Sequence, residues 1–174
     1  MTFDKTVTLK DGRTCLLRNG IASDGQAVLD VFNLTHEETD YLLTYADENS
    51  FTVSQEGDFL QRQTDSANAV EIIAVVDGVV AGTAGIDALG MRDKIKHRAV
   101  FGIAITKEFW GLGIGKYLME ACIECAREAG YLQLELEAVA ENKSAVGMYK
   151  RAGFIEYGRN PKAFRLRTGE YQEL

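Results

Sequence analysis

The sequence has very little proline and no long apolar run. Its 174 residues include a single proline, Pro161, and no repeat or Ser-rich tract that would mark a linker. No stretch comes near the ~20 consecutive apolar residues of a membrane span, and the N-terminal residues lack the apolar core of a secretion signal. With 46% hydrophobic residues, the chain suits one globular domain. We therefore expect one cytoplasmic domain over residues 1–174, with no membrane partner.

Cysteine and histidine are also scarce. Three cysteines are an odd number in a chain without a secretion signal, which argues against a disulfide framework. Cys122 and Cys125 have the spacing of a redox or metal motif, but they fall on the apolar side of a predicted helix, where packing is the commoner role. Only His36 and His97 are present besides, so a zinc site lacks ligands. We predict buried thiols and no metal site.

Positive charge is in short supply. The chain has 19 Lys and Arg residues against 26 Asp and Glu residues, a net charge of -7. This balance argues against nucleic acid as the main partner, because phosphate contacts require clustered cations. An acidic surface favours a cationic substrate such as an amine, although charge that only keeps the protein soluble explains the composition equally well.

Glycine, in contrast, is concentrated at one point. Gly111, Gly113 and Gly115 occupy alternate positions between a predicted strand, Ala99–Ile105, and a predicted helix, Ile114–Ala129. Glycine lets the backbone approach a ligand closely, and the helix start adds unpaired N–H groups and the positive end of the helix dipole. This arrangement favours a phosphate group.

The loop does not fit the nucleotide-binding loops. The ATP/GTP loop is excluded because Trp110 stands where its first glycine belongs and Tyr117 stands where its Ser or Thr belongs. The dinucleotide fingerprint fits only weakly, because the last glycine comes one residue early.

Apolar periodicity and turn residues predict the other elements. Asp-Gly turns predict hairpins over residues 6–18 and 69–89, the second with a bend or bulge at Gly82 and Gly85. Capping-box spacing predicts helix starts at Ser23, Thr35 and Thr52. The chain then continues with a strand, a helix and two further strands, at Tyr131–Ala138, Lys143–Ala152, Phe154–Arg159 and Ala163–Arg167. This order predicts an α/β (α+β) fold with a mixed, mostly antiparallel twisted sheet of six to seven strands and flanking helices.

Two motifs resemble those of a known family. The glycine loop is similar to the acyl-CoA pyrophosphate loop of the GNAT superfamily of N-acetyltransferases, Arg/Gln-x-x-Gly-x-Gly/Ala, with Trp110 in place of the Arg or Gln. The later run of Asn142, Ala145, Tyr149 and Gly153-Phe154 resembles the family's second signature. The resemblance covers residues 70–155, whereas the first seventy residues match in layout only.

The resemblance implies a function and a set of cofactor contacts. Acetyl-CoA would be the cosubstrate, and the acetyl group would pass directly to an amine of a small molecule or a protein N-terminus. A central parallel pair of strands would be splayed around the cofactor, and a homodimer is a further expectation. The residues implied to bind the cofactor are Ile103, Ala104, Ile105, Gly111, Leu112, Gly113, Ile114, Gly115, Lys116, Asn142 and Tyr149.

The resemblance also implies that Tyr149 is the general acid that protonates the departing thiolate. A phenol and an aliphatic thiol have similar intrinsic acidities, so the transfer is chemically sound. A core aromatic residue is the alternative reading of Tyr149. A non-catalytic acyl-CoA-binding or sensor domain is the alternative function for the whole chain.

The general base stays open in the sequence. Many family members carry a glutamate on the strand before the loop, where this chain has Phe101-Gly102-Ile103. Glu137 is the first candidate, and Glu135 and His97 are alternatives, each of which is also readable as a surface or structural group.

Two charged clusters have equally open roles. Glu37, Glu38 and Asp40, beside Tyr41 and Tyr45, would suit a cationic amine or would form an ordinary polar surface. The basic run Lys94, Lys96 and Arg98 would face an acidic group of substrate or cofactor, or would form a charged turn.

Overall fold

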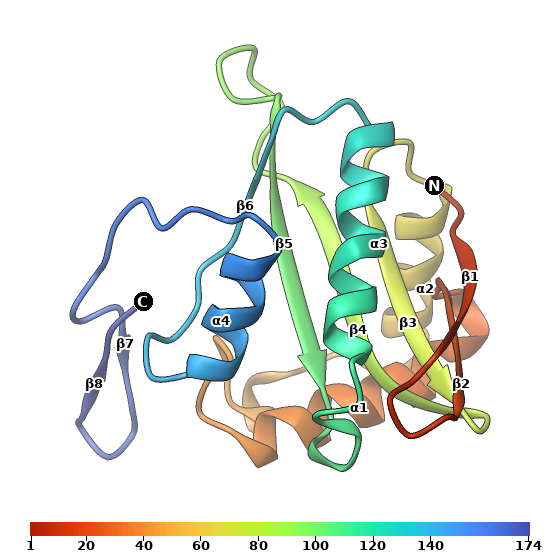
Figure 1. Ribbon diagram of the computed structural model, residues 1–174, viewed down its shortest axis with the longest axis horizontal. Helices are drawn as coiled ribbons and strands as arrows, with labels where there is room; N and C mark the ends of the chain where they lie inside the picture. Colours follow the sequence, from red (N-terminus) through yellow and green to blue (C-terminus); the bar gives the residue numbers. More distant parts are fainter.

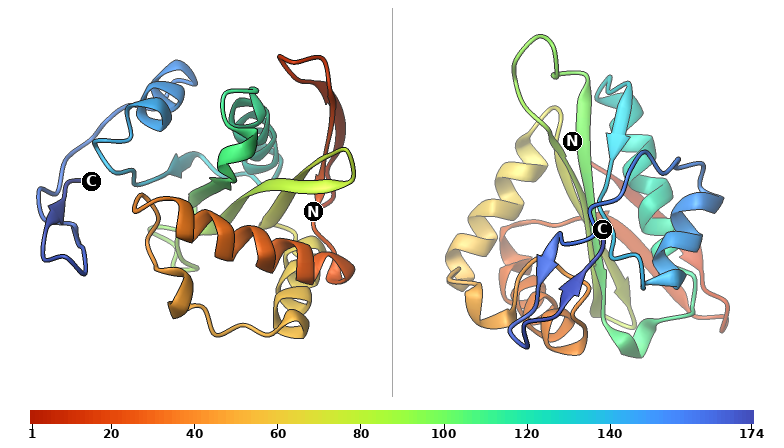
Figure 2. Two further views of the ribbon diagram at one scale, coloured as in Figure 1. Left: turned by 90° about the horizontal axis from the view of Figure 1, so that it is seen from below. Right: turned by 90° about the vertical axis from the view of Figure 1, so that its left-hand side faces the viewer.

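A curved six-stranded sheet is the centre of the computed structural model, which describes residues 1–174 (Figure 1). The strands lie in the order β1-β2-β3-β4-β5-β6, and every neighbouring pair is antiparallel except the parallel pair β5 and β6. Helices α1 and α2 cover one face, and α3 and α4 lie on the other (Figure 2). The predicted fold class is thereby confirmed. The bounds are β1 Asp4–Thr8, β2 Thr14–Asn19, α1 Gly25–Glu38, α2 Val53–Asp65, β3 Val70–Val76, β4 Val79–Ala88, β5 Arg98–Ile105, α3 Ile114–Glu128, β6 Gln133–Glu135, α4 Lys143–Arg151, β7 Phe164–Arg165 and β8 Tyr171–Gln172.

Both predicted hairpins are present, as β1–β2 and β3–β4. Asp77 and Gly78 join the second one with φ values of 51° and 82°, the left-handed conformations that a two-residue hairpin turn requires. The register shifts between Ala74 and Val75, opposite Gly82, so the predicted bulge occurs there. Gly85 pairs regularly with Glu71, so the second arm has no bulge at Gly85.

One of the three predicted helix starts is wrong. α1 runs without interruption through Thr35, because the buried Thr35 hydroxyl donates to the Val31 carbonyl oxygen 2.8 Å away and is thereby satisfied inside the helix. The start predicted at Ser23 is displaced by one residue: Asp24, not Ser23, precedes α1 as its N-cap, and the Asp24 carboxylate accepts the Ile21 N–H at 2.9 Å. Thr52 begins α2 as predicted, with a reciprocal capping box to Gln55.

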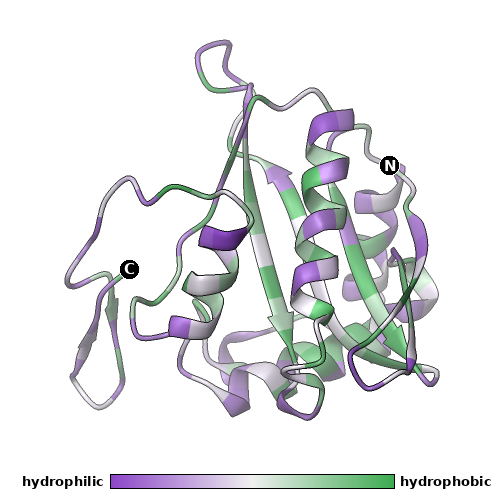
Figure 3. Ribbon diagram, in the orientation of Figure 1, coloured by the Kyte–Doolittle hydropathy of each residue, from purple (hydrophilic) through white to green (hydrophobic).

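The main core lies between α3 and the sheet. Strands β3, β4 and β5 are predominantly apolar (Figure 3), and the side of α3 that carries Leu118, Cys122 and Cys125 is buried against them. All three cysteines are free and buried, and burial raises the pKa of the Cys15 and Cys125 thiols to about 11. The thiols are therefore packing groups at neutral pH.

The C-terminal third departs most from prediction. β6 contains three residues instead of eight, and residues 154–159 form no strand, although β6 is the last strand of the sheet and its outer edge has no strand partner. β7 and β8 form a separate two-stranded ladder. The loop between them reaches the α1–α2 connection, where Arg167 donates to the Asp47 carboxylate at 2.7 and 2.9 Å. None of the helices is long and apolar enough to cross a lipid bilayer.

Candidate functional site

The parallel pair β5–β6 separates partway along its length. Pairing joins Arg98–Val100 to Gln133–Glu135 and then stops, so the rest of β5 has no strand neighbour on that side. The Thr106 N–H bonds the Ala81 carbonyl on the β4 side at 3.0 Å. Because backbone groups alternate sides along a strand, those of Ala104 face β4, and those of Ile103 and Ile105 face the open side. Ile103 therefore presents an unpaired N–H and C=O to a ligand.

Trp110 modifies the end of this open edge. Its indole N–H donates to the Ile105 carbonyl oxygen at 2.6 Å, and the Lys107 amino group lies 5.8 Å from the centre of its ring. The Ile105 carbonyl is thus already occupied, and a ligand must use the Ile105 N–H or displace the indole. The sequence showed only that Trp110 replaces an expected Arg or Gln.

The glycine loop has the backbone conformation that its sequence predicts. Gly111 and Gly113 have φ values of 80° and 98°, in the left-handed region that favours glycine. Gly113 precedes the first residue of α3 and supplies no capping side chain, so the first N–H groups of the helix remain available to an anion. Ile114 is buried and offers only its backbone, whereas Lys116 is exposed.

The β1–β2 hairpin holds this loop in place. The Lys10 N–H donates to the Leu112 carbonyl oxygen at 3.1 Å, and the Tyr117 hydroxyl donates to the Thr8 carbonyl oxygen at 3.2 Å. A Cβ on Gly113 would lie 4.0 Å from side-chain carbons of Lys10. Lys10 therefore brings a cation to the predicted pyrophosphate site. Sequence reasoning missed it, because no local pattern places a distant hairpin beside the loop.

The second motif meets the first at Met148. A Cβ on Gly115 would stand 3.1 Å from the Met148 sulfur and 3.3 Å from Cδ1 of Ile105, so the glycine loop, the end of β5 and α4 converge. Asn142 begins α4, and its Oδ1 accepts the Ala145 N–H at 3.2 Å. Its Nδ2 remains the group with which Asn142 can contact a ligand.

Tyr149 lies on the next position of α4, between two aromatic rings. Phe101 and Phe154 approach it edge to face, with ring centroids 6.3 and 6.0 Å away. Burial raises the pKa of the Tyr149 phenol to about 12, and no hydrogen bond opposes that shift. The ring thus has the packing of a core aromatic, while the hydroxyl is free to bond a ligand.

A cavity of about 1210 Å³ opens beside β6 and α4. Tyr149, Glu135 and Glu137 line it, whereas the glycine loop does not. Arg98 donates two hydrogen bonds to the Glu135 carboxylate, from Nε to Oε1 and from Nη2 to Oε2, the second at 2.7 Å. This bidentate ion pair lowers the pKa of the Glu135 carboxyl. Glu137 is exposed and makes no ion pair. His97 lies at the opposite end of β5 from the glycine loop, where its carbonyl oxygen accepts the N–H groups of Leu132 and Gln133.

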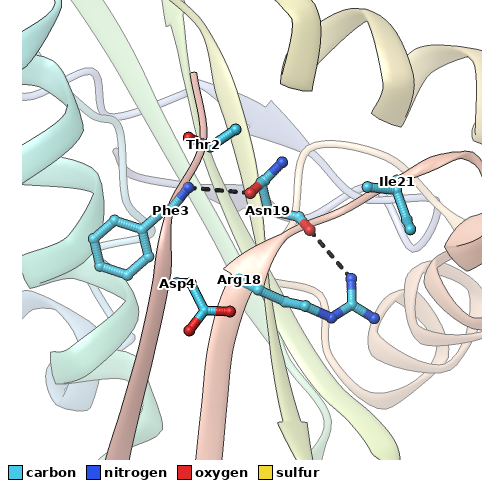
Figure 4. A pocket seen from close by; sticks show the side chains of 6 residues that line it. All are labelled: Thr2, Phe3, Asp4, Arg18, Asn19 and Ile21. Carbon is cyan, nitrogen blue, oxygen red and sulfur yellow. Dashed lines mark hydrogen bonds between the residues drawn. The ribbon is translucent and has the colours of Figure 1, made fainter.

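Two other charged regions have structural partners. Glu38 accepts the Lys107 N–H at 2.7 Å, which ties the end of α1 to the loop after β5. A smaller cavity of about 280 Å³ lies at the β1–β2 edge, away from the predicted site (Figure 4). There the Asn19 Oδ1 accepts the Phe3 N–H at 3.0 Å, and Arg18 is neutralised by Asp24. The charge of Arg18 in that cavity is therefore not available to a ligand.

Known proteins are similar to this chain in sequence and in fold. The family described as Acetyltransferase (GNAT) family matches residues 31–154. A GNAT-family acetyltransferase from Streptococcus pneumoniae is 28% identical, with a TM-score of 0.86 over 91% of this chain and 95% of that one. A putative acetyltransferase from Salmonella typhimurium, solved with acetyl-CoA, has the same fold at 15% identity, with a TM-score of 0.79 over 90% of this chain and 88% of that one.

Curated relatives are also N-acetyltransferases by name, and the aligned residues cover only part of each of them. The mouse "Probable N-acetyltransferase family 8 member 5" is 30% identical over 105 residues, which are 59% of this chain and 40% of the relative. The fission yeast (Schizosaccharomyces pombe) "N-alpha-acetyltransferase 30" is 35% identical over 33% of this chain and 38% of its own length. The chain therefore spans about two fifths of these relatives. The family match, which covers most of the chain, shows that this protein belongs to the GNAT family of acetyltransferases.

Proposed function

We propose that this protein transfers an acetyl group from acetyl-CoA directly to a primary amine of a small molecule or of a protein N-terminus. The observation that carries the proposal is the separation of β5 from β6 immediately before the glycine loop. It leaves the backbone of Ile103 unpaired, next to a helix start whose N–H groups are free. An extended arm that ends in phosphates fits such an edge, because each part supplies the hydrogen bonds that the ligand needs.

The residues present are suited to this cosubstrate. The Ile103 and Ile105 backbone would bind the arm, and residues Gly111–Lys116 would bind the pyrophosphate, with the Lys10 ammonium beside it. The Nδ2 of Asn142 would add a contact from α4. Acetyl-CoA supplies the activated acetyl thioester, and these residues would hold it against the open edge of β5.

Two side chains are proposed to move protons. Tyr149 would give its proton to the departing thiolate, which its unengaged hydroxyl allows. Glu137 is the base named from the sequence. Its exposed position gives it access to water, but no neighbouring group fixes its carboxylate.

The acceptor is proposed as an amine because the relatives are N-acetyltransferases by name, one of them an N-alpha-acetyltransferase. The net charge of -7 suits a cationic acceptor. A cytoplasmic location and a homodimer are further proposals, which cell fractionation and sedimentation analysis would test.

The test combines binding with turnover. Acetyl-CoA at 100 times its Kd should stabilise the fold by about 2.7 kcal/mol, which a thermal shift detects. CoA release should then require an amine, tested with polyamines, amino acids and peptides carrying free N-termini. Binding without release in any amine panel would instead support a non-catalytic acyl-CoA-binding domain. No stabilisation by acetyl-CoA or CoA would contradict both functions.

A further inference from the structure

Glu71 is a carboxylate outside both motifs. It lies on β3 directly opposite Gly85 of β4, and Gly85 lies opposite Gly102 of β5. Directly opposed residues of antiparallel strands point to the same face of a sheet. The flanking residues Val70 and Ile72 belong to the core under α3, so Glu71, Gly85 and Gly102 form a row on the α1 face.

The two glycines leave this row without side chains, and Glu71 extends into the gap. A Cβ on Gly85 would overlap Oε2 of Glu71, so the carboxylate lies over β4 in the direction of β5. A Cβ on Gly102 would meet nothing within 4 Å, and Val100 and Gly102 are both exposed. Neighbouring strands are about 4.8 Å apart, so the space between the carboxylate and a group held over Gly102 would suit one bridging water molecule.

The opposite face at this point is closed. The side chains of Phe101 and Ile103 pack into the core under α3, and Tyr149 lies against the Phe101 ring. An acceptor that reaches a thioester at the Ile103 backbone must therefore arrive from the α1 face, over Gly102. The proposed acid, Tyr149, is then on the far side of the sheet from the acceptor, where a departing thiolate would lie.

We propose that Glu71 is the general base, which takes the proton of the acceptor ammonium through one water molecule over Gly102. The inference rests on the proposed acetyl transfer. The ammonium group gives one proton to Glu71, and the neutral amine forms the C–N bond as the C–S bond breaks. The thiolate takes the Tyr149 proton, the new amide nitrogen loses its extra proton to solvent, and Tyr149 regains a proton from solvent while Glu71 releases its own.

The surroundings of Glu71 suit this role. Burial raises the pKa of the Glu71 carboxyl to about 7, Asp87 and Glu56 act in the same direction, and the Thr83 hydroxyl opposes them. Asp87 comes from β4 and Glu56 from α2. The buried side chains of α1, those of Val28, Val31 and Thr35, carry no charge. The nearest β2 cation, Arg18, is paired with Asp24. A base with a pKa near the working pH is the most efficient kind.

Variants of the full chain test the assignment by amine-dependent CoA release from pH 5 to 10. In the wild type, the plot of kcat/KM against pH should bend near pH 7, where the base titrates. Glu71→Gln should lower kcat/KM at pH 7 by about 100-fold or more and remove this bend, without changing acetyl-CoA affinity. Glu71→Asp should lower the rate but keep the bend. Gly85→Ala keeps the Glu71 side chain, but the added methyl group forces its carboxylate to move. This variant should therefore also lower kcat/KM. Asp58→Asn, an exposed carboxylate on α2, is the charge control.

The outcomes separate the two proposals. Wild-type protein that releases no CoA with any amine would overturn both the acetyl transfer and the role of Glu71. Wild-type turnover with an unchanged rate and pH profile in Glu71→Gln would overturn the role of Glu71 alone. Loss of the bend in Glu137→Gln but not in Glu71→Gln would assign the base to Glu137 and equally overturn this inference.

Discussion

Tyr149 keeps its proton throughout the physiological range, because burial raises the pKa of its phenol to about 12. Tyr149→Phe removes that proton but retains the ring contacts with Phe101 and Phe154. We expect kcat to fall by about 10²–10⁴-fold, with acetyl-CoA affinity unchanged. Steady-state kinetics and calorimetric titration measure the two effects. Tyr157→Phe, at an exposed tyrosine of the same cavity, is the control, and equal rates in both variants would refute the acid assignment.

The Trp110 indole N–H occupies the Ile105 carbonyl oxygen, which the proposed cosubstrate would otherwise be able to use. Trp110→Phe keeps an aromatic ring but removes the indole donor, so the carbonyl becomes available. One hydrogen bond is worth about 1 kcal/mol, which corresponds to about fivefold tighter binding of acetyl-CoA. Titration calorimetry of both proteins measures the ratio. Weaker binding by the variant would show instead that the indole supports the loop that the cosubstrate needs.

Single residues show where sequence reasoning ends. Glycines 111 and 113 were predictable, because their spacing before a helix has a local physical meaning. Lys10 and Glu71 were not, since their relevance depends on a hairpin packed against a loop and on the strand register that aligns Gly85 and Gly102.

At the scale of elements, the junction between the glycine loop and α3 depends on Gly113. Gly113→Ala imposes a φ of 98° on alanine, which costs about 1–2 kcal/mol. The added methyl group also stands where a phosphate would approach the helix start. We expect a lower Tm and at least ~10-fold weaker acetyl-CoA binding, the latter from a loss of ~1.4 kcal/mol. Gly158→Ala is the control, at an open position that a Cβ would leave free of contacts. Unchanged affinity in Gly113→Ala would remove the pyrophosphate role of this junction.

Elements with strong local patterns were predicted well, and elements that depend on distant partners were not. The apolar stripe of α3 and the capping box of α2 lie within one turn or one face, so the sequence contains the information. Residues 154–159 have strand-like composition but pair with no strand, and composition alone does not determine whether a segment docks on a sheet edge. Thr35 has cap spacing, yet the turn before it satisfies its hydroxyl.

At the scale of the whole molecule, acid and base are proposed on opposite faces of one sheet. The splayed edge of β5 lies between them, so the attacking and leaving groups are handled from different sides. The sequence motifs predicted the cofactor side of this arrangement. The acceptor side could not be predicted, because it is built from the α1 face of three strands that are distant in sequence.

The stability of the whole fold should depend on pH through Glu71. Its pKa rises from 4.5 to about 7 on folding, so between these values the folded state binds more protons and stability falls as pH rises. The loss should reach about 3 kcal/mol above pH 7. Denaturant titrations from pH 4 to 8 should therefore show Glu71→Gln matching the wild type at pH 4 and exceeding its stability at pH 8, with Asp58→Asn as the charge control. Parallel curves for wild type and Glu71→Gln would mean that Glu71 does not titrate in this range. Because a base that works near pH 7 must titrate there, that result would contradict the role of Glu71.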